Sequence, residues 1–348
     1  MKKSKNNLYK RDLKTKGDGV VGNSYNKAGL FEASERLTDI VHRTPFKQSQ
    51  TLNDWTGSEV FLKLENLQKT GSFKIRGAFN KVAQLSKEEC SRGLIAASAG
   101  NHAQGVALAG RERGIPVTIY MPKTTPETKV SATRKYGATV KLYGRNFDEA
   151  YVAAREEQLE SGATFIHPFD DLAVIEGQAT VAMEMLQQQP GLDTIIVPAG
   201  GGGLLAGTAL AVKTIRPDVK VIGVQAANSP AIYTSFHGMR NNNIPFLPTI
   251  AEGICVNEPG KLTMDIIHNY VDGMITVTEQ EISSTIVFML EREKLLVEGA
   301  AAAAIAAVLN KKIPVSSAKT GVIVSGGNFD LSKVGDCMLR ATNSVQNF

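Results

Sequence analysis

Short runs of β-branched and other apolar residues alternate with longer, more polar stretches along most of the chain. In the first half, apolar runs predict strands at residues 94–98, 117–121, 140–143 and 164–167, and the stretches between them predict helices at residues 102–113, 126–136 and 147–160. Strands that alternate with helices in this way indicate a parallel sheet covered by helices. The block has the size of a small α/β domain.

A second alternating block follows. Its expected strands lie at residues 194–198, 220–225, 274–278 and 320–325, and its expected helices at residues 173–188, 204–215, 279–293 and 299–309. Residues 241–260, which include three consecutive asparagines and several prolines, predict an irregular loop. Residues 31–86 are expected to join the larger sheet. The predicted organisation is a flexible arm at 1–30, a small domain at 93–167, and a large domain built from 31–92 and 168–348.

Composition narrows the class of protein. The chain has 348 residues, of which 43% are hydrophobic, enough for two buried cores. Its net charge of +5 is spread along the chain and favours no nucleic-acid partner. No apolar run is long enough to cross a bilayer. Three cysteines without metal-type spacing predict neither a disulfide framework nor a metal site, which is typical of a cytoplasmic protein.

One lysine stands behind an aromatic residue at the end of a glycine-containing turn. These residues are Phe73 and Lys74, in the segment KTGSFKIRGA at residues 69–78, and the run after them reads as a helix. A lysine amine can form an imine with an aldehyde cofactor such as pyridoxal phosphate. Most lysines are solvated surface charges, so this segment alone is weak evidence for a cofactor site. Three other segments, far apart in the sequence, each supply a further part that such a site needs.

The first of these three is a run of glycines after the expected strand at 194–198, formed by Gly200, Gly201, Gly202 and Gly203 and followed by Leu204. Glycines at the start of a helix let backbone N–H groups approach an anion, which predicts a phosphate site. A flexible turn is the plain alternative. The run lacks the lysine of a P-loop and the spacing of a dinucleotide-binding motif, so a nucleotide is disfavoured.

The other two segments also follow expected strands. SAGNHAQG at residues 98–105 offers small residues and a helix start that can bind a carboxylate, with Asn101 able to bond a phenolic oxygen. A simple helix cap by Ser98 or Asn101 is compatible with the same pattern, and His102 is assigned no proton-transfer role. SGGN at residues 325–328 places the Ser325 hydroxyl where it can donate to a pyridine nitrogen, although a plain turn explains this tetrapeptide equally well.

Taken together and in order, the four segments resemble those of the fold-type II pyridoxal phosphate enzymes, the tryptophan synthase β family, and in particular its threonine ammonia-lyases (threonine dehydratases). Weaker matches are FLKLEN at residues 61–66, HPFDD at 167–171 and VEGA at 297–300. The resemblance covers residues 37–331 and implies an α/β fold of two open domains with bound pyridoxal 5′-phosphate.

The resemblance also implies roles for individual residues. Lys74 forms the internal aldimine and then removes the Cα proton of the substrate. Around the cofactor, Phe73 lies beside the ring with Gly253 near it, Asn101 bonds the 3′ oxygen, Ser325 faces the ring nitrogen, and Gly200, Gly201, Gly202, Gly203 and Leu204 hold the phosphate. The substrate carboxylate rests on the loop formed by Ser98, Ala99, Gly100, Asn101 and His102. The implied reaction converts L-threonine, and L-serine, to a 2-oxo acid and ammonia, in a homodimer or homotetramer.

Three departures from relatives sharpen this expectation. Serine racemases of the family carry a second serine where Ala99 stands, so racemisation is disfavoured. Gln225 stands where those relatives use a glutamate to bind a divalent metal, so no such site is expected. The chain stops soon after Asn328, whereas many threonine ammonia-lyases continue into a regulatory domain, which favours the short, catabolic-like form.

Alternatives remain at this stage. A dehydratase for another β-hydroxy amino acid is compatible with the motifs. A β-replacement enzyme such as cysteine synthase is less so, because its usual threonine-rich substrate loop and Gly-Thr-Gly-Gly phosphate loop are absent. An amino-acid sensor on the same fold would not need Lys74 with Asn101 and Ser325.

Overall fold

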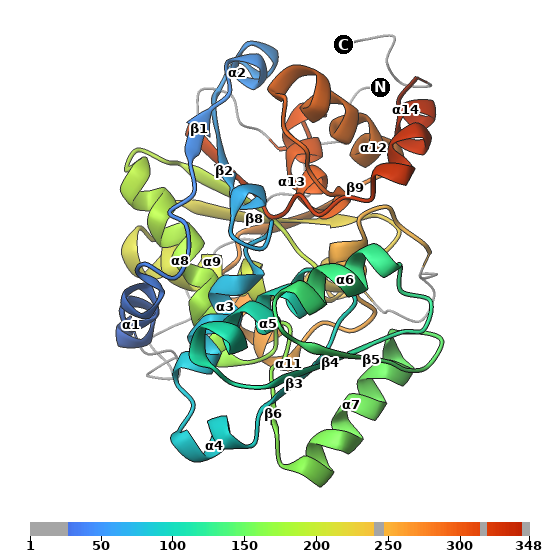
Figure 1. Cartoon of the computed structure of the whole chain (residues 1–348). Coiled ribbons are helices and arrows are strands. Elements are labelled where there is room, and N and C mark those ends of the chain that lie inside the picture. Colours follow the sequence, from blue (N-terminus) through green and yellow to red (C-terminus); the bar gives the residue numbers. More distant parts are fainter. Residues whose placement is uncertain (1–26, 240–246, 314–318, 343–348) are drawn as a thin grey trace.

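The computed structural model describes residues 27–239, 247–313 and 319–342, which fold into two α/β units with separate sheets (Figure 1). The larger sheet has six strands in the order β1-β2-β10-β7-β8-β9. Their bounds are β1 (Phe46–Gln48), β2 (Glu59–Leu64), β7 (Thr194–Pro198), β8 (Lys220–Ala226), β9 (Gly273–Val277) and β10 (Lys319–Val324). Only the edge strand β1 is antiparallel to its neighbour, and the other five are parallel.

The smaller sheet is entirely parallel, with the order β5-β4-β3-β6. Its strands are β3 (Leu94–Ala97), β4 (Val117–Met121), β5 (Thr139–Leu142) and β6 (Thr164–Phe165). In Figure 1 this sheet occupies the lower half of the molecule and the larger sheet the upper half.

Helices precede, separate and follow the strands. They are α1 (Lys27–Leu37), α2 (Gln50–Thr56), α3 (Lys74–Ala83), α4 (Lys87–Ser91), α5 (Asn101–Arg113), α6 (Glu127–Lys135), α7 (Phe147–Ser161), α8 (Leu172–Gln188), α9 (Gly203–Ile215), α10 (Ala231–Phe236), α11 (Lys261–Tyr270), α12 (Glu279–Phe288), α13 (Gly299–Leu309) and α14 (Val334–Thr342). No helix within the described ranges is long and apolar enough to span a membrane.

Side-chain alternation along the central strands divides the core of the larger unit in two. Ile195 and Val197 of β7 face one core with α8 and α9, whereas Ile196 faces the other core with α13. Successive side chains of a strand point to opposite faces, so a sheet covered on both sides needs apolar residues at every position. This explains the continuous apolar runs at residues 194–198 and 320–324.

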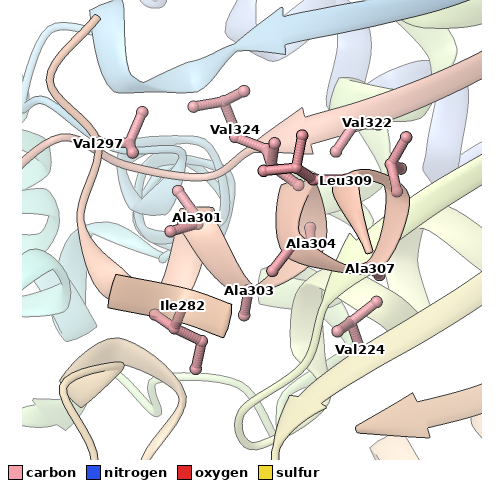
Figure 2. Close-up of a cluster of buried hydrophobic side chains, with 14 of the residues drawn as sticks. Val224, Ile282, Val297, Ala301, Ala303, Ala304, Ala307, Leu309, Val322 and Val324 are labelled. Carbon is pink, nitrogen blue, oxygen red and sulfur yellow. The ribbon is translucent and has the colours of Figure 1, made fainter. Parts of the chain in front are cut away.

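Helix α13 is buried on all sides, and seven of its eleven residues are alanine. Gly299 is buried, and every residue from Ala300 to Leu309 is at most 2% exposed. Figure 2 shows the alanines of this helix between Val224 and Val322 of the sheet and Ile282 of α12. Alanine side chains are short, so a helix made of them can pack closely against both a sheet and a second helix. The apolar stretch at 300–309 is therefore a buried core helix.

Helix α3 lies between the two units. Its apolar residues Ile75, Ala78 and Val82 share one core with α5, β3 and β4 of the smaller unit. Its other side contacts α8 of the larger unit, where the amide of Gly77 donates to Oε1 of Gln178 at 3.1 Å. The sequence motif around Lys74 thus sits at the junction of the two sheets.

The expected elements in both alternating blocks are present, with ends that differ by a few residues. The stretch at 31–86 supplies β1 and β2 to the larger sheet. Helix α1 begins at Lys27, inside the range expected to be an arm, and residues 1–26 lie outside the described part. The single helix expected at 279–293 was wrong at its end: α12 stops at Phe288 and a π-helical turn (Met289–Glu293) follows, closed by Lys294 at φ 58°.

We expect that enlarging one buried alanine of α13 destabilises the fold. Ala304→Leu adds three carbons at a fully buried position, and overpacking of this kind typically costs about 1–3 kcal/mol of unfolding free energy. Ala28→Leu on the exposed side of α1 is the matched control. Urea denaturation should show a lower midpoint for Ala304→Leu alone, and equal midpoints for both variants would contradict the packing described for α13.

Candidate active site

The candidate site forms where the carboxyl ends of several strands meet. Loops that leave β2, β10, β7 and β3 carry the four motifs expected from the sequence. The loop before α3 is joined to the loop after β10, because the amide of Phe73 donates to the carbonyl of Ser325 at 3.1 Å and the amide of Gly327 to that of Gly71 at 2.9 Å. Ser72 and Gly326 form an antiparallel bridge between them. Two motifs more than 250 residues apart in the sequence are thus held together by backbone hydrogen bonds.

Lys74 opens helix α3, and its amine is turned toward the interior of the site. Nζ donates to the carbonyl of Pro168 at 2.9 Å and lies 5.3 Å from the centre of the Phe73 ring. Burial lowers the pKa of Lys74 to about 8, against the opposing effect of the Glu298 carboxylate. Desolvation disfavours a charged ammonium, so a far larger fraction of this amine is neutral near pH 8 than for an exposed lysine. A neutral amine is the form that attacks an aldehyde.

The loop between β3 and α5 is small and open. Ser98 Oγ accepts from the amide of Gly100 at 3.2 Å, which shapes the turn, and a Cβ placed on Gly100 would meet no atom within 4 Å. No side chain caps the first turn of α5. The unpaired N–H groups of an uncapped helix start attract a carboxylate. The helix cap considered for Ser98 or Asn101 is therefore not formed, because the Ser98 hydroxyl bonds within the loop, and the helix start is left available.

The glycine run between β7 and α9 is enclosed by its surroundings. A Cβ on Gly201 would lie 2.3 Å from the Phe169 ring, and one on Gly202 would lie 2.8 Å from Thr263, whose hydroxyl donates to the carbonyl of Gly201 at 2.8 Å. Gly202 also has φ 98°, which strongly favours glycine. No side chain caps α9, so its first N–H groups are available to an anion.

Asn101 is held by two side chains from distant segments. Its Nδ2 donates to both Glu298 oxygens at 2.9 Å, and its Oδ1 accepts from Asn328 Nδ2 at 2.7 Å. These bonds fix the orientation of the amide, with its N–H₂ toward the carboxylate. A Cβ on Gly253 would lie 3.5 Å from Oε1 of Glu298, and one on Gly326 would lie 2.5 Å from it. The Glu298 carboxylate therefore lies at the centre of the expected cofactor-binding segments.

Glu298 is a residue that we did not single out in the sequence. The only signal was its place in the weakly matching VEGA segment, directly before the apolar helix α13. Burial raises the pKa of Glu298 to about 7, while the Asn101 hydrogen bond and the charges of Lys129 and Lys74 act in the opposite direction. A carboxyl group with this pKa changes its charge in the range where the Lys74 amine also titrates.

Two of the expected site residues contribute in a different way from their neighbours. The His102 side chain is buried, and its Nε2 donates to the carbonyl of Ile166 at 2.8 Å. Burial and the charge of Lys74 lower the pKa of His102 to about 3, so it is neutral at physiological pH. The Leu204 side chain packs in the core with α8. Only the backbone of either residue is available to a ligand.

These groups fit a phosphorylated pyridine aldehyde. The fit rests on the buried Lys74 amine, the enclosed glycine run and the Ser72 hydroxyl, which is fully buried and has no hydrogen-bond partner among the described residues. Ser325, expected to face the ring nitrogen, is 2% exposed. No group of three or more His, Cys, Asp or Glu side chains in the described ranges is arranged to hold a metal ion.

Comparisons with known proteins agree with this chemistry. The family described as "Pyridoxal-phosphate dependent enzyme" matches residues 37–326. The chain is 50% identical over 305 residues to the L-threonine ammonia-lyase of Thermotoga maritima, covering 88% of this chain and 76% of that protein. It is 43% identical over 307 residues to the catabolic L-threonine dehydratase TdcB of Escherichia coli K12, covering 88% of this chain and 93% of that protein.

A solved structure agrees as well. The processed form of threonine deaminase isoform 2 from Solanum lycopersicum has a TM-score of 0.85 and 35% identity, covering 91% of this chain and 90% of that one. These matches confirm the resemblance drawn from the four motifs, and the chain belongs to the family of pyridoxal-phosphate-dependent enzymes.

Proposed function

We propose that this protein is an ammonia-lyase for β-hydroxy amino acids, with L-threonine as its main substrate and L-serine as a second one. L-Threonine loses its Cα proton and its β-hydroxyl, and the product hydrolyses to 2-oxobutyrate and ammonia. L-Serine gives pyruvate and ammonia in the same way. The names of the two curated relatives and their identity over 88% of the chain support this choice of substrate.

The observation that carries the proposal is the buried amine of Lys74. When bound here, pyridoxal phosphate would supply an aldehyde for an imine with this amine and an electron sink for the substrate Cα. Lys74 accepts the Cα proton at Nζ, which its lowered pKa of about 8 favours near neutral pH. Pro168, whose carbonyl accepts from Nζ at 2.9 Å, orients the amine.

Other residues bind and orient. The first turn of α5 and the loop of Ser98, Ala99 and Gly100 bind the substrate carboxylate through N–H groups. The glycine run before α9 binds the phosphate in the same manner. Asn101, held by Glu298 and Asn328, lies where its Nδ2 can donate to the phenolic oxygen in place of one Glu298 oxygen, and Ser325 faces the ring nitrogen.

The proposed function also bears on the domains, the oligomeric state and the location of the protein. We infer a small domain at residues 93–167 and a large domain built from 31–92 and 168–348, with the site between them. As in the family that the motifs resemble, we infer a homodimer or homotetramer located in the cytoplasm. A dehydratase for another hydroxy amino acid, or a β-replacement enzyme, is the outcome to consider if the assay below finds no 2-oxo acid.

The first test of the function is 2-oxo acid release by purified protein loaded with pyridoxal phosphate. We expect 2-oxobutyrate from L-threonine, pyruvate from L-serine, and loss of both in Lys74→Ala together with the visible absorbance of the lysine-bound cofactor. Lys69→Ala, five residues away in the same loop, is the control that retains activity. Undiminished turnover by Lys74→Ala would show that another group takes the proton.

The pH dependence of kcat/KM tests Glu298. Above its pKa of about 7 Glu298 is the carboxylate that accepts from Asn101, so activity should rise with pH through this value. In Glu298→Gln an amide oxygen accepts the same bond without titrating, and the acid limb should flatten. Glu252→Gln is a matched control, because two lysines hold the pKa of Glu252 below its ordinary value and the limb should persist. A limb unchanged in Glu298→Gln would assign the titration to another group.

Racemisation tests Ala99. Epimerising serine requires a proton donor on the face of the substrate opposite Lys74, and an alanine side chain has none to give. Ala99→Ser restores a hydroxyl in this loop, and we expect D-serine to form from L-serine at a rate above that of the wild type. Ala99→Gly controls for a change in loop flexibility. The reaction mixture is analysed by chiral chromatography. Absence of D-serine with Ala99→Ser would refute the explanation that Ala99 leaves the second face of the substrate without a proton donor.

A further inference from the structure

Four charged side chains, three of them fully buried, form a cluster behind helix α3. They are Lys63 and Glu65 at the end of β2, Arg76 of α3 and Glu184 of α8, and we refer to them as the buried ion cluster. Lys63, Glu65 and Arg76 are 0% exposed, and the Glu184 side chain is 16% exposed. Two positive and two negative charges balance. The cluster lies outside the loops that form the candidate site.

Arg76 is the centre of this cluster and uses every N–H of its guanidinium group. Nε and Nη2 donate to the two oxygens of Glu65, both at 2.8 Å. Nη1 and Nη2 donate to the two oxygens of Glu184, at 2.7 and 3.1 Å. The remaining bonds go to the Thr180 hydroxyl and the His42 carbonyl, at 3.1 and 3.3 Å. Two planar forks on one guanidinium fix its position in all directions, which a lysine ammonium cannot do.

The cluster is tied to Lys74 through the first turn of α3. The amide of Arg76 donates to the carbonyl of Phe73 at 3.0 Å, closing the turn that contains Lys74. Residues two apart on a helix project about 200° from each other, because each residue turns the helix by about 100°. Arg76 and Lys74 therefore point to opposite sides of α3. Rotating the helix about its axis would move both side chains.

Glycine contacts leave α3 no space to adjust. A Cβ on Gly105 of α5 would lie 3.0 Å from the backbone carbon of Lys74, and a Cβ on Gly177 of α8 would lie 2.6 Å from the Arg76 carbonyl oxygen. Helix α8 also follows the segment whose Pro168 carbonyl accepts from Lys74 Nζ. Pro168, which accepts from Lys74, and Glu184, which accepts from Arg76, thus belong to one continuous stretch of chain.

Stability alone does not account for such a cluster. Removing charges from water is costly, and replacing a buried ion pair by apolar residues often leaves the stability of the fold unchanged or raises it. Directional ion pairs can instead select one arrangement of the helices that carry them. We propose that Arg76 is a positioning residue: its double fork to Glu65 and Glu184 sets the rotation of α3 and thereby the place of the Lys74 amine. This inference rests on the proposed function, in which that amine reacts.

The test compares Arg76→Lys with Lys63→Met. Arg76→Lys keeps the charge and loses the forks. Lys63 is equally buried and bonds Glu184, Gln188 and the Thr44 carbonyl, none of which is on α3. Glu184→Gln is a milder second variant, in case Arg76→Lys does not fold. Two readouts are taken below the melting temperature of each variant: kcat and KM for L-threonine, and the pH dependence of Lys74 acetylation in cofactor-free protein, followed by peptide mapping.

We expect all three variants to melt at lower temperature. Arg76→Lys should lower kcat by about 10- to 100-fold, since a misplacement near 1 Å can cost this much, with KM within twofold. The midpoint for Lys74 acetylation should move from about 8 toward 10.5, as the displaced amine gains water. Glu184→Gln should shift both readouts in the same direction and by less, and Lys63→Met should change neither.

Two results would overturn the proposal. One is an Arg76→Lys protein, or a Glu184→Gln protein if the first does not fold, with wild-type kcat and acetylation midpoint. The other is a Lys63→Met protein that loses as much kcat as Arg76→Lys, which indicates a general effect of destabilisation. Because acetylation is measured without cofactor or substrate, a wild-type protein inactive on L-threonine refutes the proposed function and leaves the acetylation test of Arg76 in place.

Discussion

The amine of Lys74 lies in a protein interior where a full positive charge is disfavoured, and the rest of the site is arranged around this constraint. One hydrogen bond, to the Pro168 carbonyl, directs it, and burial lowers its pKa to about 8. A flexible exposed lysine would be charged and mobile, and therefore unreactive at neutral pH. Helix α3 supplies the rigid support, because it is packed against α5 on one side and α8 on the other.

A second feature is the way distant segments meet at Glu298. This carboxylate binds Asn101 from the smaller unit, lies beside Gly326 after β10, and is close to Gly253. Its contact with Asn101 joins residues 197 positions apart in the chain. Movement of the smaller sheet relative to the larger one would change this contact directly. The orientation of Asn101 and the relative placement of the two units are therefore coupled.

Much of this arrangement could be predicted from the sequence, and the exceptions have physical reasons. Strands such as β7 and β10 are buried on both faces, so they appear as unbroken apolar runs between glycines. The motifs at residues 98–105, 200–204 and 325–328 could be placed because each follows an apolar strand. Glu298 could not, since its importance arises from contacts with segments far away in the chain.

The ion cluster escaped prediction for a related reason. Lys63, Glu65 and Arg76 look like ordinary surface charges in the sequence, and only the packing of α3 on α8 shows that they are buried and paired. The end of α12 was missed because the π turn at 289–293 has the same composition as a regular helix. The local sequence pattern predicts the helices and strands well, whereas tertiary contacts decide which polar residues are buried.

The account depends most on the identity of the lysine that holds the cofactor. Treating the pyridoxal phosphate-loaded protein with borohydride reduces the carbon–nitrogen double bond to a stable secondary amine, and peptide mapping by mass spectrometry then locates the modified residue. We predict that the modification lies on Lys74 and on no other lysine. A cofactor fixed to a different lysine, or one that binds and cannot be fixed by reduction, would contradict the role assigned to the buried amine.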